Sequence, residues 1–168
     1  MQESVFITYN PNSDNEKNIA LDLYKKGKQN GYFIYLPERN NYFSRISQQT
    51  KLNIDSANWF VIFSTSQLSE TVKDEIEHAF KSKKDSNIIV IYSKHFGKNI
   101  DFPNNKPIEM FIDDYNLNSI EQFKRDLFEK IKSVRNIKEK EGASGLEILL
   151  GVGAALLLLG ALTSDKKK

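Results

Sequence analysis

The fold of this chain is decided by one stretch, residues 59–80, which reads WFVIFSTSQLSETVKDEIEHAF. It opens with the apolar run 60–63, which is short, rich in β-forming residues and bounded by polar ones. Such a run is typical of a strand buried on both faces of a parallel sheet. Ligand sites of parallel sheets lie beyond the carboxyl ends of the strands. We therefore expect residues 64–69 and the start of the next helix at the functional edge.

The second half of the stretch predicts an amphipathic helix. Ser69 is its expected N-cap, and the acidic residue that follows suits the positive end of the helix dipole. At roughly 100° per residue, Glu75 falls about 85° from the centre of the apolar stripe. This phase predicts a carboxylate at the border between core and solvent, and it equally fits an ordinary helix with a solvated glutamate. The stripe itself has the spacing i, i+4, i+7, i+8 and consists of Val72, Ile76, Ala79 and Phe80.

Composition narrows the classes of function. The chain has 168 residues, enough for one domain of ordinary size plus an appendage. Its formal net charge is +2 and its lysines are spread out, so we expect no nucleic-acid partner. It has no cysteine, which excludes disulfides, thiolate nucleophiles and Cys-ligated metals. With only two histidines a His-rich metal site is not expected, and no secretory signal is visible at the N-terminus.

Short β-rich runs alternate with amphipathic segments along the chain. Ser13-x-x-Glu16 has the spacing of a capping box at the start of the first helix, and Gly31 is a stop signal at its end. Strands that alternate with helices imply right-handed crossovers and a parallel sheet with helices on both faces. The sequence therefore predicts an α/β, flavodoxin-like doubly wound domain with a five-stranded parallel sheet. The expected strands are at 4–9, 32–36, 60–63, 87–92 and 107–112.

The end of the chain has a different composition. We predict a globular domain at 1–137, a polar, helix-breaking linker at 138–145, a hydrophobic helix at 146–163 and a basic tail at 164–168. The apolar run is about 17 residues, near the lower bound for a membrane-spanning helix. Small residues four apart within it would let two such helices approach closely. Membrane insertion, burial in a homo-oligomer and packing on the globular domain all fit this segment.

Several motifs resemble those of a TIR (Toll/interleukin-1 receptor) domain. Residues 5–10, VFITYN, look like the family's opening box, usually F-I-S-Y-S, and an acidic residue follows as in the family. Gly31 stands where the family has a glycine before the second strand. Residues 64–75 resemble the segment that ends in S-x-W-x-x-x-E, with Glu75 at the last position. The resemblance covers about residues 3–136.

The resemblance implies an enzymatic activity. Enzymatic members of the family cleave NAD+ at the nicotinamide–ribose bond, and some cyclise the product. Their catalytic glutamate matches Glu75, whose carboxylate would stabilise the oxocarbenium-like charge that develops as the bond breaks. NAD+ would be the substrate, and no separate cofactor or metal is implied. Contacts to the substrate are expected from Tyr9, Asn10, Ser64, Ser69, Tyr42, Phe43 and Arg45.

The resemblance and the apolar segment together also predict where the protein lies in the cell and how its copies assemble. We expect a cytoplasmic domain held at a membrane by residues 146–163, with homo-oligomers formed through the TIR domain and this tail helix. Self-association would activate NAD+ cleavage, as expected of an effector in microbial antiviral defence. A short helix that clusters copies would serve this need by raising their effective concentration.

The sequence departs from the family pattern at several positions. Thr71 stands where the family has Trp, Thr8 and Asn10 where Ser is common, and the loop after the second strand lacks the usual Pro-Gly. These departures keep two alternatives open. One is a non-catalytic TIR scaffold that recruits other TIR domains. The other is a membrane-perturbing effector whose tail helices are clustered by the TIR domain.

Overall fold

The computed structural model of the chain describes residues 2–38 and 46–144. Five strands form one sheet in the order β2-β1-β3-β4-β5, and every neighbouring pair is parallel. The predicted α/β class and five-stranded parallel sheet are confirmed, and the strand order is consistent with a flavodoxin-like fold. The strands are β1 (Glu3–Thr8), β2 (Tyr32–Tyr35), β3 (Trp59–Ser64), β4 (Ile88–Ser93) and β5 (Ile108–Ile112).

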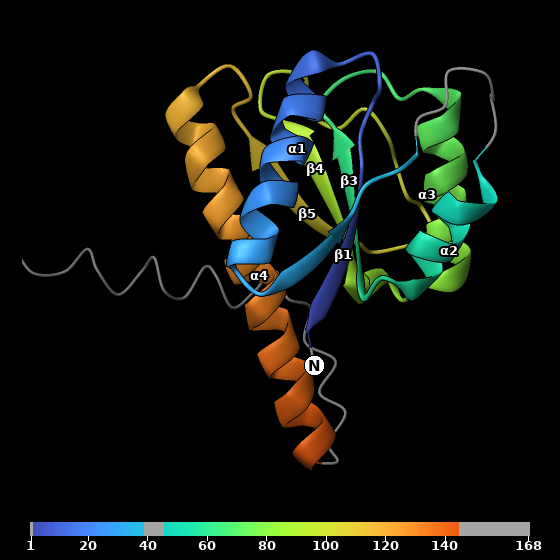
Figure 1. Cartoon of the computed structure of the whole chain (residues 1–168), viewed down its shortest axis with the longest axis vertical. Coiled ribbons are helices and arrows are strands. Elements are labelled where there is room, and N and C mark those ends of the chain that lie inside the picture. The colour runs from blue at the N-terminus through green and yellow to red at the C-terminus, as the bar shows by residue number, and fades with distance from the viewer. Residues whose placement is uncertain (1, 39–45, 145–168) are drawn as a thin grey trace, which may run out of the picture. The chain divides into compact units, whose positions relative to one another are not determined.

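Helices cover both faces of the sheet. Figure 1 shows α1 on one side and α2 with α3 on the other. The first part of α4 shares the side of α1, since the rings of Phe63 on β3 and Phe123 on α4 lie 6.0 Å apart. The helices are α1 (Asp14–Gln29), α2 (Gln48–Ser56), α3 (Glu70–Ser82), the short 3-10 helix η1 (Asp85–Asn87) and α4 (Leu117–Ser144).

The two faces have separate apolar cores. On the α2 and α3 side, Phe6 and Phe60 stack with ring centroids 5.6 Å apart within a cluster that includes Ile76. On the α1 side, Gly27 lies so close to Ile34 that an added Cβ would be 2.3 Å from Ile34 Cγ1. Every residue of β3 and of β4 is buried, as predicted for strands without polar alternation.

The predicted ends of α1 are confirmed. The Ser13 hydroxyl accepts a hydrogen bond from the backbone N–H of Glu16 at 3.3 Å, as an N-cap does. Gly31 has φ of +80°, a left-handed conformation that glycine adopts without the strain of a side chain. This turn brings the chain directly from α1 into β2.

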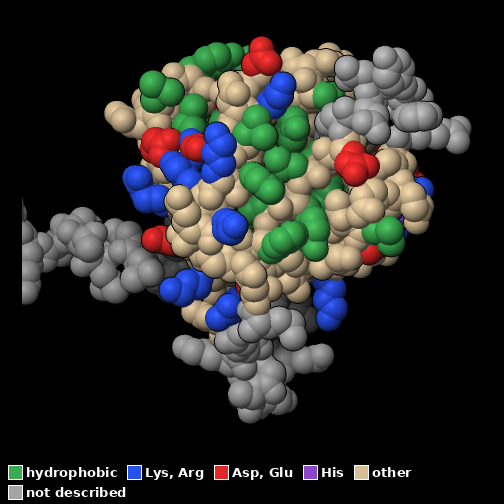
Figure 2. Space-filling model, viewed as in Figure 1, with side chains coloured by type: hydrophobic (Ala, Val, Ile, Leu, Met, Phe, Trp, Pro, Cys, Tyr) green, Lys and Arg blue, Asp and Glu red, His purple; other side chains and the backbone are tan. Residues whose placement is uncertain are grey.

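The edge strands β2 and β5 present part of their apolar surface to solvent. Figure 2 shows hydrophobic side chains gathered across the middle of the visible face. On β2, Phe33 is 51% exposed, and its ring packs edge-on against Tyr35 with centroids 4.7 Å apart. On β5, Phe111 is 46% exposed. The prediction that 107–112 forms an edge strand is therefore confirmed.

Contacts divide the chain into two compact units, Met1–Phe128 and Glu129–Lys168. The second unit contains the end of α4, which continues to Ser144. Residues 138–144 of the predicted linker at 138–145 belong to α4, and the division into domain, linker and tail stays a prediction. In the ranges that the structure describes, no helix has both the length and the apolar character needed to cross a membrane. The predicted hydrophobic helix at 146–163 and basic tail at 164–168 lie outside those ranges.

Candidate functional site

The loops that leave the carboxyl ends of the strands gather at one edge of the sheet, at the top in Figure 1. The strand order places the topological switch point between β1 and β3, where open α/β sheets bind ligands. Among the described residues, the segments expected to be functional, 9–10 and 64–69, lie at this edge. Three places at the edge are described below: the surroundings of Glu75, those of Glu16, and a cavity formed by the loops.

Glu75 lies on the face of α3 that packs against the sheet. Its side chain is 1% exposed, and the hydroxyl of Thr8, at the end of β1, donates a hydrogen bond to Glu75 Oε2. The prediction of a carboxylate at the border between core and solvent is wrong: Glu75 is buried. Helix α2 packs against α3 and widens its buried surface, which helix phase alone does not reveal.

Glu16, on α1, is the second buried carboxylate at this edge, at 0% exposure. It accepts four hydrogen bonds, from the backbone N–H of Asn10, the backbone N–H and hydroxyl of Thr65, and the hydroxyl of Ser66. The distances run from 2.7 to 3.2 Å. The predicted capping box is thus only half confirmed, because the Glu16 side chain reaches the loop after β3 instead of the Ser13 N–H. Sequence analysis missed this role, and the only available signal was an acid in the first turn of α1.

Two predicted substrate contacts lie at the end of β1. Asn10 is 8% exposed, and its amide nitrogen donates to Ser66 Oγ at 3.1 Å and to the Gln67 carbonyl at 2.6 Å. These bonds tie the loop after β1 to the loop after β3. Tyr9 is also buried, at 7% exposure. The structure brings both residues to the switch point, and it gives Asn10 the role of joining two loops.

The predicted serines also have local partners. Ser64 donates a hydrogen bond to Asn99 Oδ1, and the Asn99 amide donates to the Ser66 carbonyl at 2.7 Å. Ser69 is the N-cap of α3 and accepts from the Val72 N–H at 3.4 Å, as predicted. Three further predicted contacts lie outside the described residues: Tyr42, Phe43 and Arg45.

A cavity of about 840 Å³ opens at the same edge, and we call it the edge cavity. It is lined by residues of the loops that follow β1, β3, β4 and β5, by Asn15 of α1 and by Lys73 of α3. Neither Glu75 nor Thr8 is among its lining residues. Residues that sequence analysis did not single out line it, among them Asn15, Phe96, Asn99, Asp114 and Tyr115.

The loop after β5 is held by buried polar contacts. Asp114 is 7% exposed, and its Oδ1 accepts a hydrogen bond from Ser93 Oγ at 2.7 Å. The Asn15 amide donates to the Asp114 carbonyl at 2.9 Å, which ties α1 to this loop. The signal available in the sequence was position alone, because Asp114 follows β5 by two residues, at the edge where ligands bind.

A hydrogen bond lowers the pKa of Asp113, which precedes the cavity residue Asp114 in the chain. The His95 ring lies 2.9 Å from Asp113 Oδ1, and this hydrogen bond lowers the pKa of Asp113 below its usual value. The same ring packs edge-on against Tyr115, with centroids 5.0 Å apart. Asp113 and His95 therefore help to position the aromatic ring at the mouth of the cavity.

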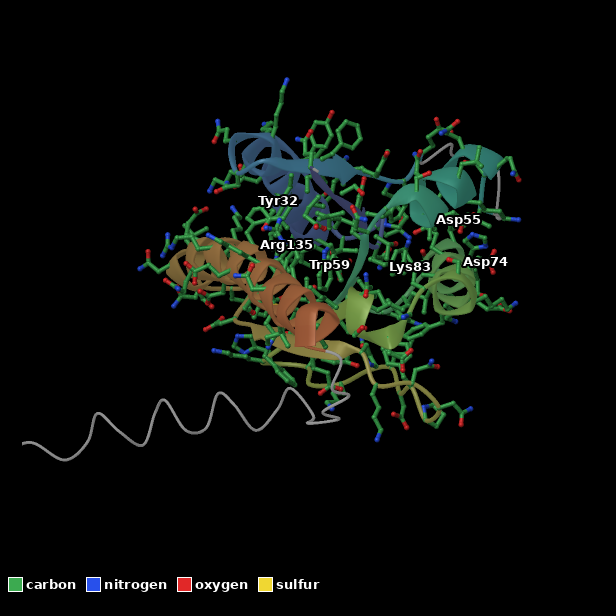
Figure 3. All side chains as sticks on the ribbon, turned by 90° about the horizontal axis from the view of Figure 1, so that it is seen from below. Tyr32, Asp55, Trp59, Asp74, Lys83 and Arg135 are labelled. Carbon is green, nitrogen blue, oxygen red and sulfur yellow. The ribbon has the colours of Figure 1, made fainter. Side chains whose placement is uncertain are left out.

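A second group of charges lies on the α2 and α3 side, where Figure 3 labels Asp55, Asp74 and Lys83. Asp55 pairs with His78 at 2.9 Å. Lys83 donates to the Ala57 carbonyl at 2.5 Å, and burial lowers its pKa. In the part of the chain that the structure describes, no group of three or more acidic or histidine residues could hold a metal ion.

No protein-family model matches the chain, and no match was found among curated proteins.

Proposed function

We propose that the protein is an NAD+ glycohydrolase or cyclase of TIR type, with Glu75 as its catalytic carboxylate. One observation carries this proposal. Glu75 is a buried carboxylate on the helix that follows the central strand, beside the carboxyl end of β1, where Thr8 donates to it. Buried carboxylates at the ligand edge of a parallel sheet are candidates for catalysis. The position also matches the glutamate of the S-x-W-x-x-x-E segment that the sequence resembles.

The proposed reaction breaks the bond between the nicotinamide nitrogen and C1 of the ribose. The bonding electrons leave with nicotinamide, which departs neutral, so no general acid is needed. The ribose carbon becomes oxocarbenium-like, and the Glu75 carboxylate stabilises that charge electrostatically. Water then adds to the carbon and releases a proton, which gives ADP-ribose. Attack by a group of the same molecule in place of water would give a cyclic product.

The remaining parts of the proposal concern assembly and location. Copies associate through the TIR-like domain and the tail, and association activates NAD+ cleavage in antiviral defence. The domain lies in the cytoplasm and is held at the membrane by residues 146–163. The apolar composition of that segment and the TIR resemblance support this arrangement.

The test is NAD+ turnover by the full-length protein, with product identification, for wild type, Glu75→Gln and Glu77→Gln. Glutamine keeps the shape of Glu75 and can still accept from Thr8, so the fold should persist. Loss of one electrostatic stabiliser lowers kcat by about 10²–10³-fold. Glu77 lies on the same helix with its side chain 67% exposed, so its substitution is a matched control. Equal turnover by wild type and Glu75→Gln would remove Glu75 from the mechanism.

A second candidate function is a non-catalytic interaction module. It is favoured by the near-complete burial of Glu75 and by its absence from the lining of the edge cavity. In that case Glu75 serves the packing of α3 against β1. Wild-type protein would then leave NAD+ intact at every protein concentration, and Glu75→Gln would change only stability.

A further inference from the structure

We propose that the edge cavity binds a ribonucleoside, in a site separate from Glu75 and independent of the NAD+ chemistry. Its volume of about 840 Å³ lies within the range of about 300–1,000 Å³ found for small-molecule sites. It opens beyond the carboxyl ends of the strands, where ligands of parallel sheets bind. The chemistry of its lining indicates which class of ligand it takes.

Two aromatic rings supply a surface for a planar base. Phe96 is 63% exposed and Tyr115 is 70% exposed, although both line the cavity. Large aromatic side chains left in solvent beside a cavity are suited to stacking on nucleobases, since every base has a π-face. Contact with His95 limits the freedom of the Tyr115 ring, which lowers the entropy lost on stacking.

Asp114 supplies the acceptor for a ribose diol. Its Oδ1 is occupied by Ser93, whereas its Oδ2 has no hydrogen-bond donor among the described residues. Asp114 is also one of the residues that line the edge cavity. A carboxylate at the carboxyl edge of a sheet is the group that holds ribose hydroxyls in dinucleotide sites. An unoccupied carboxylate oxygen beside aromatic rings therefore favours a ribonucleoside over a bare base.

The charges of the lining disfavour a polyphosphate. Lys73 is the only cation among the described lining residues, and its Nζ is 2.6 Å from Glu70 Oε1. Asp114 adds a negative charge to the same cavity. Amide groups complete the lining, and Gln67 offers both a donor and an acceptor for the edge of a base. The ligand is therefore a nucleoside with little or no phosphate.

Calorimetric titration of the full-length protein with the common ribonucleosides tests the proposal. At least one, with adenosine as the first probe, should bind, and its 2′,3′-dideoxy analogue should bind about ten-fold more weakly or worse, because the carboxylate loses its donors. The corresponding nucleoside diphosphate should bind no more tightly than the nucleoside. Absence of binding by every ribonucleoside at millimolar concentration overturns the proposal, and equal binding of the dideoxy analogue overturns the role of Asp114.

Variants place the ligand in the cavity. Tyr115→Ala should weaken binding about five-fold or more, through loss of base stacking. Because Tyr115 is exposed, this variant should fold as wild type does. Phe111→Ala is the matched control, since Phe111 is an exposed aromatic on β5 that does not line the cavity. Unchanged binding by Tyr115→Ala overturns the assignment. Glu75→Gln should bind the nucleoside as wild type does, so this proposal and the catalytic one can fail separately.

Discussion

The two faces of the sheet bury their glutamates in different surroundings. On the α1 face, Glu16 accepts hydrogen bonds from the end of β1 and from the loop after β3. On the α3 face, Glu75 accepts from Thr8 within the apolar layer between β1 and α3. Both carboxylates are almost completely buried, and both lie near the carboxyl ends of the central strands.

The comparison teaches that burial by itself does not distinguish a catalytic carboxylate from a structural one. Glu16 accepts hydrogen bonds from backbone and hydroxyl donors of the two loops that it joins. These bonds give its burial a structural explanation. The chemical role proposed for Glu75 depends instead on its place on α3 and on the resemblance of the surrounding residues to the S-x-W-x-x-x-E segment. We therefore expect substitution of Glu16 to lower the stability of the fold, whereas the proposed function predicts that substitution of Glu75 lowers NAD+ turnover.

The largest expected effect on stability is that of Glu16→Gln. In this variant an amide N–H₂ replaces one of the two carboxylate oxygens, both of which accept hydrogen bonds. Each buried donor that is left without an acceptor costs about 1–3 kcal/mol. We expect the free energy of unfolding to fall by about 4 kcal/mol, summed over the affected donors. Urea denaturation measures this change, with Glu77→Gln as the exposed control. A loss below about 1 kcal/mol, the value of an ordinary hydrogen bond, would contradict the proposed role of Glu16.

Thr8→Val should have the next largest effect, on the other face. It removes the hydroxyl that donates to Glu75 and keeps the volume of the side chain. Loss of a donor to a buried carboxylate should lower the free energy of unfolding by about 2 kcal/mol. Thr8→Ser retains the hydroxyl and is the control in the same urea titration. Equal stability of the Val and Ser variants would show that the hydroxyl contributes nothing.

Gly27→Ala tests the packing of α1 on the sheet. The added methyl would lie 2.3 Å from Ile34 Cγ1, so the Ile34 side chain, β2 or α1 must shift. Overpacking costs about 1–3 kcal/mol, and the gain in helix propensity offsets up to about 1 kcal/mol of it. We expect a net loss of about 1.5 kcal/mol in thermal or urea unfolding. The double variant Gly27→Ala with Ile34→Ala, which removes Ile34 Cγ1 and Cδ1, should lose less than the sum of the single changes, and simple additivity would contradict the clash.

The smallest expected effect depends on pH. Hydrogen bonding to Lys124 lowers the pKa of Asp22 below 3.8, so Asp22 contributes stability above that pH. The contribution is lost as the pH falls through the lowered pKa of the folded state. Asp22→Asn should therefore cost about 1 kcal/mol or less at neutral pH, because the pair is partly exposed, and a smaller amount near pH 2. Urea titrations at both pH values measure the difference, and an equal deficit at both would exclude the ion pair as its cause.

Much of the fold follows from local patterns in the chain. Apolar runs without alternation predicted strands buried on both faces, and their alternation with amphipathic segments predicted the parallel sheet. The N-caps Ser13 and Ser69 and the stop at Gly31 were also correct. These features depend on backbone geometry and periodicity over a few residues, which a sequence carries directly.

Features that depend on distant segments were decided by tertiary packing. Helix phase put Glu75 at the border of the core, but the folded chain buries it beside Thr8 of β1. Spacing assigned Glu16 to a capping box, but its carboxylate accepts from Thr65, which is 49 residues away in the chain. The edge cavity joins the loops after β1, β3, β4 and β5, which lie far apart in the chain. Contacts between segments far apart in the chain leave no local pattern, because each residue type there would suit an ordinary loop or helix equally well.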